Sequence, residues 1–274
     1  MKKFLFALIF IALFSGSVYA ENLKIGELAK LNMTPEDLQK INSQIPASKS
    51  QAYRNYDALN GEYKFYDSLN TMLLALNKGE IDRVILPEDV AKYVLNNTKD
   101  FQVNSIVKLK REHYFSFGFH DDENGRKLRK IFNDALFTLK NSGRLSVLKE
   151  KYIAEMGEFK PLEFAKFDGA DTIKVAVTGD LPPVDYTAED GAPAGFNIAV
   201  LAECAKLAKI NLEIVSIDAK ARAAALVSGR VNLVFWFQSR EKEKQSWDVP
   251  EGVILSEPYY NYDELYLLEL RKNK

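Results

Sequence analysis

The sequence ALNKGEIDRVI, residues 75–85, returns later in the chain as ALVSGRVNLVF, residues 225–235. Both copies begin with Ala-Leu, and their glycines, Gly79 and Gly229, are 150 positions apart. Three residues after the glycine comes Asp82 in one copy and Asn232 in the other. Apolar residues at helical spacing lead to each glycine, which is typical of a helix C-terminus, and a short apolar strand follows. The chain therefore contains one helix-to-strand unit twice, and Asp82 and Asn232 are expected to satisfy backbone groups beside their strands.

The segments around both copies predict an α/β fold, because short and nearly continuous apolar strands alternate with helices. The predicted strands are residues 24–28, 62–66, 81–86, 105–119, 172–178, 212–217, 231–237 and 265–270. The predicted helices are a helix opening at Thr34 and residues 68–76, 87–95, 125–141, 145–152, 196–208 and 222–227. Residues 179–195, rich in Gly, Pro and Asp, predict a loop. Two α/β lobes with one copy each account for the duplication.

Length and composition set broad limits on the class of protein. A chain of 274 residues is long enough for one large domain or two small ones. The formal charge of -1 shows no excess of basic residues, so nucleic acid is not an expected partner. The single cysteine, Cys204, excludes an internal disulfide and lies in an apolar helical run, which predicts a buried side chain.

The N-terminus has the pattern of a cleaved secretory signal. Lys2 and Lys3 precede an apolar run over residues 4–14, and small residues follow up to Ala20. We expect cleavage after Ala20. The absence of a cysteine near this position predicts a soluble mature protein, periplasmic or secreted, without a lipid anchor.

Residues 174–268 resemble the first lobe of the periplasmic solute-binding proteins of the amino-acid-binding type, family 3. The motifs that carry the resemblance are Val175-Ala176-Val177, Pro182-Pro183, Asp190-Gly191, Gly195-Phe196-Asn197, the second copy of the repeat, and Leu255 to Tyr260. Residues 62–153 resemble the second lobe of the same family. Because the second-lobe part comes first, the chain looks circularly permuted. The expected divisions are a signal at 1–20, one lobe at 21–154, a linker at 155–172 and the other lobe at 173–274.

The resemblance implies a two-lobed periplasmic binding protein fold of type II, in which each lobe is a mixed, mostly parallel sheet flanked by helices. It implies that a ligand binds between the lobes and that hinge motion closes them. It further implies a small polar solute as ligand, an amino acid being one candidate, and a membrane ABC permease as partner. No catalysis, cofactor or metal is expected, and the protein is expected to be a monomer.

Seven residues are candidates for ligand contact, all near positions where the family binds its ligand. Ser239 matches the family's Ser/Thr-rich turn, and Arg240 lies four residues before the position of the family's arginine. Glu88 and Asp89 directly follow Pro87, which holds the place of an aspartate that binds an α-amino group in the family. The other candidates are Trp236, at the end of a strand, and Asp180 and Tyr186, on the predicted loop.

Two other functions are compatible with the same fold. Some dehydratases resemble these binding proteins and use an acid in the cleft, for which Glu88 is the candidate here. A sensor that presents its closed form to a membrane receptor is the other alternative. Turnover of a substrate distinguishes the enzyme from the two binding functions.

Overall fold

The computed structural model describes residues 23–28, 61–155, 162–218, 221–239, 249 and 251–271, with backbone alone for 110–112 and 236–239. The predicted signal segment, the helix expected at Thr34 and the candidate Arg240 lie outside these residues.

In the described residues, nine strands form one mixed sheet, and the order along its path is β2-β1-β3-β12-β4-β10-β5-β9, with β11 paired to β4. These strands are β1 (Lys24–Leu28), β2 (Glu62–Tyr66), β3 (Arg83–Pro87), β4 (Phe101–His120), β5 (Thr172–Val177), β9 (Asn211–Ser216), β10 (Leu233–Ser239), β11 (Val253–Leu255) and β12 (Tyr260–Leu270). A small antiparallel sheet contains β6 (Asp180–Leu181), β7 (Asp185–Thr187) and β8 (Pro193–Ala194).

The helices flank the large sheet. They are α2 (Leu69–Asn77), α3 (Glu88–Asn97), α4 (Glu123–Asn141), α5 (Arg144–Lys149), the π-helical turn η2 (Glu150–Ala154), α6 (Phe196–Ala208) and α7 (Arg222–Val227). The predicted α/β class is confirmed. The loop predicted for residues 179–195 is wrong in part, because this segment folds back on itself as β6, β7 and β8. The single helix predicted at 145–152 is α5 followed by η2.

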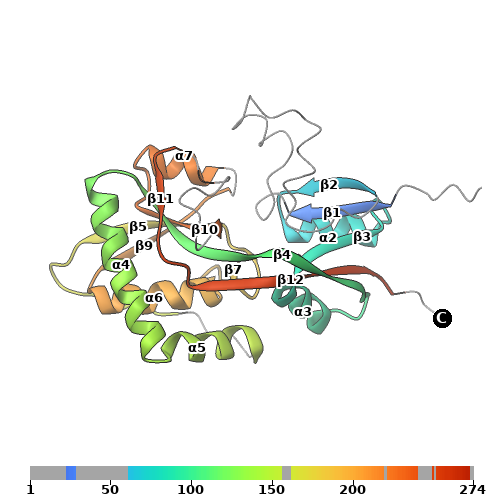
Figure 1. The fold of residues 1–274 in the computed structure, drawn as a ribbon, viewed down its shortest axis with the longest axis horizontal. Helices are drawn as coiled ribbons and strands as arrows, with labels where there is room; N and C mark the ends of the chain where they lie inside the picture. The colour runs from blue at the N-terminus through green and yellow to red at the C-terminus, as the bar shows by residue number, and fades with distance from the viewer. Residues whose placement is uncertain are drawn as a thin grey trace, which may run out of the picture.

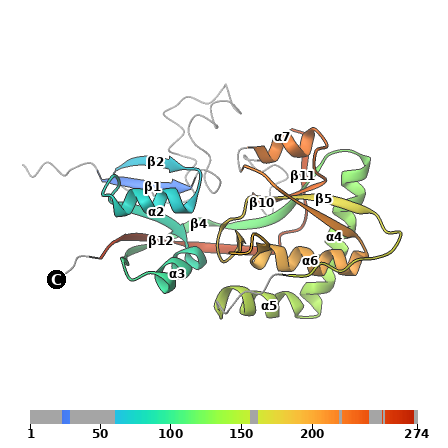
Figure 2. The same cartoon turned by 180° about the vertical axis from the view of Figure 1, so that it is seen from behind.

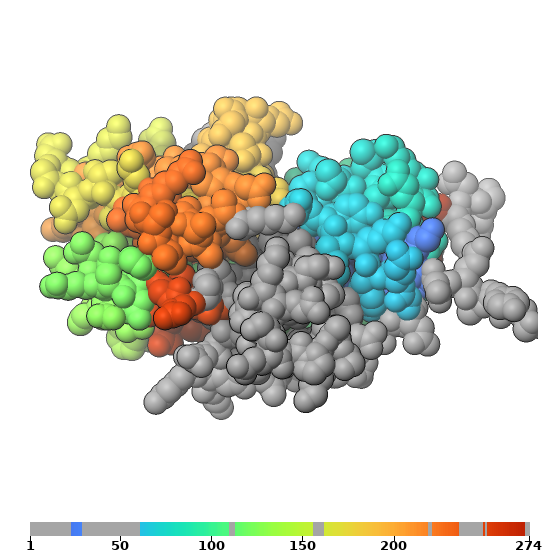
Figure 3. Space-filling model, turned by 90° about the horizontal axis from the view of Figure 1, so that it is seen from above, coloured from blue at the N-terminus to red at the C-terminus, as the bar shows by residue number. Residues whose placement is uncertain are grey.

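Two bodies lie at the two ends of the sheet, and β4 and β12 run through both (Figure 1). The β1 body contains β1, β2, β3, α2 and α3, and the β5 body contains β5 to β11 and α4 to α7 (Figures 1 and 2). Seen from above, residues of the two bodies come into view on opposite sides of the molecule (Figure 3). Helices α4 and α5 pack on α6 within the β5 body. The predicted lobe boundary at residue 154 stays a prediction, and it would separate α4 and α5 from this packing partner.

The two copies of the repeat have the same geometry. Gly79 and Gly229 end their helices with φ of 71° and 73°, in the left-handed region where glycine is favoured. Asp82 accepts a hydrogen bond from the Lys24 N–H at 2.7 Å, and Asn232 accepts one from the Lys174 N–H at 2.8 Å. Each acceptor's own N–H donates back to the carbonyl of the same lysine. The predicted role of Asp82 and Asn232 is confirmed.

Aromatic side chains form the centre of the core in the β5 body. Phe117 on β4 is fully buried, stacks on Tyr259 with ring centroids 4.7 Å apart, and meets Phe132 of α4 edge-on. Cys204 on α6 is buried, as predicted, and burial raises the pKa of its thiol. Large buried rings contribute much of the hydrophobic stabilisation of a domain.

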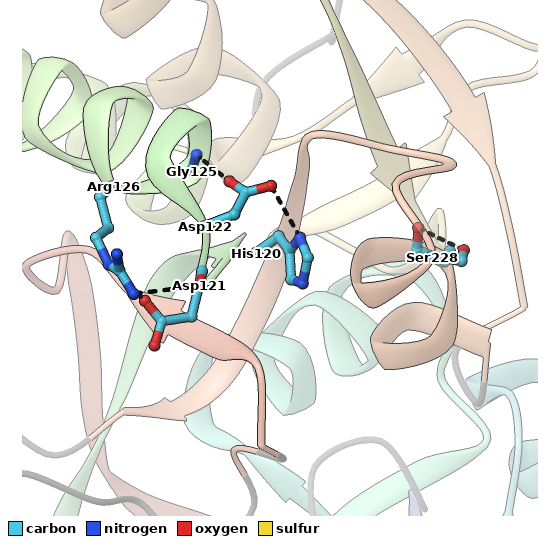
Figure 4. A network of polar contacts seen from close by, with 7 residues as sticks. His120, Asp121, Asp122, Gly125, Arg126 and Ser228 are labelled. Carbon is cyan, nitrogen blue, oxygen red and sulfur yellow. Dashed lines mark hydrogen bonds and ion pairs between the residues drawn. The ribbon is translucent and has the colours of Figure 1, made fainter.

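The junction of β4 and α4 is tightly built (Figure 4). Asp122 caps α4 by accepting a hydrogen bond from the Gly125 N–H at 2.7 Å, and its other oxygen lies 3.1 Å from His120 Nδ1. The capping hydrogen bond lowers the pKa of Asp122, and His120 lowers it further. A Cβ added at Gly125 would lie 1.8 Å from the His120 carbonyl oxygen, so only glycine fits this turn.

Candidate functional site

The parallel strands of the two bodies point their carboxyl ends at each other. Strand β3 ends at Pro87, which is paired with Leu265 of β12. Strand β10 ends at Ser239, which is paired with Tyr114 of β4, and Tyr114 is in turn paired with Asn261 of β12. Leu265 and Asn261 are four residues apart, roughly 13 Å along a strand. Ligands of open α/β sheets bind at the carboxyl ends of strands, so this region between the bodies is the candidate site.

Helix α3 begins at this edge and provides the acidic groups of the site. Glu88 and Asp89 form its first turn, where carboxylates interact favourably with the helix dipole. The hydroxyl of Tyr260, the first residue of β12 and only 4% exposed, donates a hydrogen bond to Asp89. The hydroxyl of Tyr266 lies 3.5 Å from Glu88, and Lys92 pairs with Glu88.

Burial raises the pKa of both partners of the Asp89–Tyr260 hydrogen bond. Desolvation raises the pKa of Asp89, while the bond from Tyr260 and the charge of Lys149 lower it in part. Desolvation also raises the pKa of Tyr260, and the adjacent Asp89 adds to this effect. Tyr260 therefore keeps its proton and remains the donor at neutral pH.

The hairpin of β6 and β7, in the β5 body, contacts the β1 body. Asp180 on β6 is paired with Tyr186 on β7. The Tyr186 ring lies 6.5 Å from the ring of Tyr93 on α3, measured between centroids. Desolvation raises the pKa of Tyr186, and Tyr93 and Tyr152 add to the shift. The hairpin therefore contacts the opposite body through an aromatic pair.

A cavity of about 440 Å³ is lined by residues of both bodies. The β1 body provides Asp89 and Lys92, and α5 with η2 provides the rest of its lining: Ser146, Lys149, Glu150, Ile153 and Ala154. A second cavity of about 380 Å³ shares Ser146 and Lys149 with the first and includes Tyr260 in its lining. The Lys149 ammonium lies 5.1 Å above the centroid of the Tyr260 ring. A solute in the first cavity would touch both bodies at once.

The structure brings four of the seven predicted site residues to this interface: Glu88, Asp89, Asp180 and Tyr186. Trp236 and Ser239 lie in the last part of β10, at the same edge, with their side chains outside the described atoms. Arg240 lies outside the described residues. Ligand contact by any of the seven stays a prediction.

Other residues of this interface were not among the sequence candidates. Lys92 and Tyr93 lie four residues after Glu88 and Asp89, so helical spacing alone would have placed them on the same faces of α3. No sequence pattern pointed to Lys149, because it lies on α5, which is far from α3 in the sequence. Leu181 on β6 is fully buried.

The segment from β5 to β12 is similar to a known family. Residues 173–270 match the family of bacterial extracellular solute-binding proteins, family 3. The resemblance found in the sequence is therefore confirmed for this segment. Amino-acid specificity and circular permutation stay predictions. No curated protein sequence matches the chain.

The solved structures that the chain is similar to share little sequence with it. The ligand-binding component of an ABC-type import system from Staphylococcus aureus, with zinc bound, is 12% identical, with coverage of 90% of this chain and 65% of that one and a TM-score of 0.44. A periplasmic substrate-binding protein of an ABC transporter from Coxiella burnetii is 13% identical, with coverages of 90% and 84% and a TM-score of 0.41. The VFT2 domain of BvgS from Bordetella pertussis is 11% identical, with coverages of 91% and 80% and a TM-score of 0.43. The chain thus spans less than two thirds of the length of the first of these structures.

Within the part of the chain that the structure describes, none of the helices has the length and apolar character needed to cross a membrane.

Proposed function

We propose that this protein is an extracytoplasmic solute-binding protein that captures a small polar solute between its two bodies. The observation that carries the proposal is the facing arrangement of the carboxyl ends of β3 and β10, bridged by Asp89 and Tyr260. The match of residues 173–270 to solute-binding proteins supports it. Polar groups from both bodies line the intervening cavity, so a bound solute would favour closure.

The proposed role is delivery of the solute to an ABC-type importer in the membrane, by a protein that acts as a monomer. An amino acid is the first candidate, because the cavity lining includes both carboxylate and ammonium groups. The circular permutation inferred from the sequence belongs to this proposal. It would place the two chain ends at one of the crossings between the lobes.

The proposal includes no catalysis. Glu88, the acid considered for a dehydratase, is paired with Lys92 and contacted by Tyr266. An acid that donates a proton to a substrate needs access to the reacting atom and a matching base. The contacts of Glu88 do not favour that role, so the binding function is preferred.

A thermal-shift screen tests the proposal. The protein from residue 21 onward is screened against amino acids, small peptides, organic acids and polyamines, because a ligand of the folded state raises the Tm by mass action. Each hit is repeated with Asp89→Ala and with Asp134→Ala, an exposed acid on α4 that serves as the control. We expect a hit that Asp89→Ala weakens and Asp134→Ala does not.

Small-angle scattering with the same hits measures closure. A decrease in the radius of gyration on binding supports capture between the bodies. Turnover of a hit would favour the dehydratase, and a panel without any hit would contradict a transport role for these solute classes.

A further inference from the structure

We propose that the Lys149 ammonium occupies the place that a solute's ammonium group takes, so that Lys149 acts as an internal competitor for the site. This inference rests on the proposed function and adds to it a residue that controls the affinity for the solute. The solute would contain an ammonium group, and its affinity would depend on displacing Lys149.

The surroundings of Lys149 are those of an ammonium site. Its Nζ lies 5.1 Å above the Tyr260 ring, within the range at which a cation is attracted to an aromatic face. The hydroxyl of the same ring donates to Asp89, a partly buried carboxylate. The ring and the carboxylate both attract a cation, and the Lys149 ammonium is the cation that lies over the ring.

The charges around Asp89 support the same assignment. The charge of Lys149 lowers the pKa of Asp89 more than the charge of Lys92 does, while desolvation, the largest effect, raises it. Lys92 is already paired with Glu88, one residue before Asp89. The remaining acid of the cavity, Glu150, comes from η2 in the same body as Lys149. Lys149 is thus the principal cation compensating Asp89.

The Lys149 side chain can also move out of this position. It lies in the last turn of α5, its side chain is exposed, and it lines both cavities. A lysine on a flexible stem can swing its head into water at little cost. Its departure would open the Tyr260 face at a point that both cavities, of about 440 and 380 Å³, share. A solute ammonium could then take its position beside Asp89.

The test compares binding of tetramethylammonium chloride and putrescine to the purified protein and to Lys149→Met, with sodium chloride at matched ionic strength. Met keeps most of the side-chain length and loses the charge. We expect Lys149→Met to bind the ammonium probes about tenfold more tightly, because the competing cation is gone. Lys149→Arg, which keeps a cation, should bind like the original protein.

Lys92→Met is the matched control, because Lys92 lines the same cavity but is held by Glu88. It should change the affinity by less than Lys149→Met does. A measurement without ligand adds a second readout: carboxyl ¹³C NMR should show a higher pKa for Asp89 in Lys149→Met, since the Lys149 charge lowers it.

Three results would overturn the proposal. Equal or weaker probe binding by Lys149→Met would show that Lys149 does not compete. An unchanged pKa of Asp89 in that variant would show that the two groups do not interact. Failure of all ammonium probes, while the thermal-shift screen finds another solute, would remove the ammonium site and leave the proposed solute-binding function standing. Failure of the whole screen as well would remove both.

Discussion

Asp82 and Asn232, 150 positions apart in the sequence, make the same pair of hydrogen bonds to the start of a neighbouring strand. One side chain is a carboxylate and the other an amide, but in both an oxygen accepts from a lysine backbone N–H. Both positions therefore require a side chain of this length with an oxygen that accepts a hydrogen bond, and the charge of the side chain matters less than this acceptor.

The first prediction follows from that requirement. Asp82→Asn and Asn232→Asp should each change the free energy of unfolding by less than about 0.5 kcal/mol, because an acceptor oxygen remains. Asp82→Ala and Asn232→Ala should each cost about 1 kcal/mol, the net value of one hydrogen bond. Urea denaturation measures all four. Equal losses for the alanine and the exchange variants would contradict the acceptor role.

The second prediction concerns the hydrogen bond between the bodies. Tyr260→Phe should lower the free energy of unfolding by about 2 kcal/mol, because Asp89 loses its donor while the ring keeps its contacts with Phe115 and Phe196. Thermal and urea denaturation at pH 7 measure the loss. Tyr266→Phe is the control, since its hydroxyl is 3.5 Å from Glu88 and should contribute little. A Tyr260→Phe variant as stable as its control would show that the bond is unimportant.

The third prediction concerns pH. The pKa of Asp89 is raised above its ordinary value of 3.8, mainly by desolvation. Below pH 3.8 the Asp89 carboxyl is protonated in both the folded and the unfolded state, and its pKa shift then costs no stability. As the pH rises, the unfolded state loses this proton first, which favours unfolding. The stability of the folded state therefore falls as the pH rises from 3.8 through the folded pKa. Asp89→Asn cannot lose a proton and still offers an oxygen to Tyr260. Its stability relative to the original protein should therefore increase between pH 3.5 and pH 7.

Urea denaturation at several pH values checks this expectation. Asp134→Asn, on the exposed face of α4, gives the effect of removing one acid without burial. A difference between Asp89→Asn and the original protein that stays constant from pH 3.5 to pH 7 would be evidence against a raised pKa.

The fourth prediction concerns the junction of β4 and α4. Gly125→Ala should destabilise the protein by at least about 2 kcal/mol, because the added Cβ collides with the His120 carbonyl. Gly143→Ala is the matched control: its φ is 72°, but nothing lies within 4 Å of an added Cβ, so only backbone strain of about 1 kcal/mol is expected. Differential scanning calorimetry of both variants compares the two costs. A smaller loss for Gly125→Ala than for Gly143→Ala would refute the close approach.

Much of the fold could be predicted because its signals are local. The bounds of β2, α6 and α7 match the predicted ranges, since apolar spacing and terminal glycines act over one or two turns. The hairpin of β6 and β7 was missed because strands of two and three residues are too short to show alternation. The π-helical turn was missed for a similar reason, as its residues fit an α-helical spacing equally well.

The sequence by itself determined the α/β class, the duplicated helix-to-strand unit and the place of the acidic groups after β3, because each depends on residues close together in the chain. Only the tertiary structure decided that Asp89 meets Tyr260, that Tyr186 meets Tyr93, and that Lys149 covers the Tyr260 ring. These contacts join elements far apart in sequence. They depend on how β4 and β12 pass from one body to the other, and no local pattern of residues specifies that path.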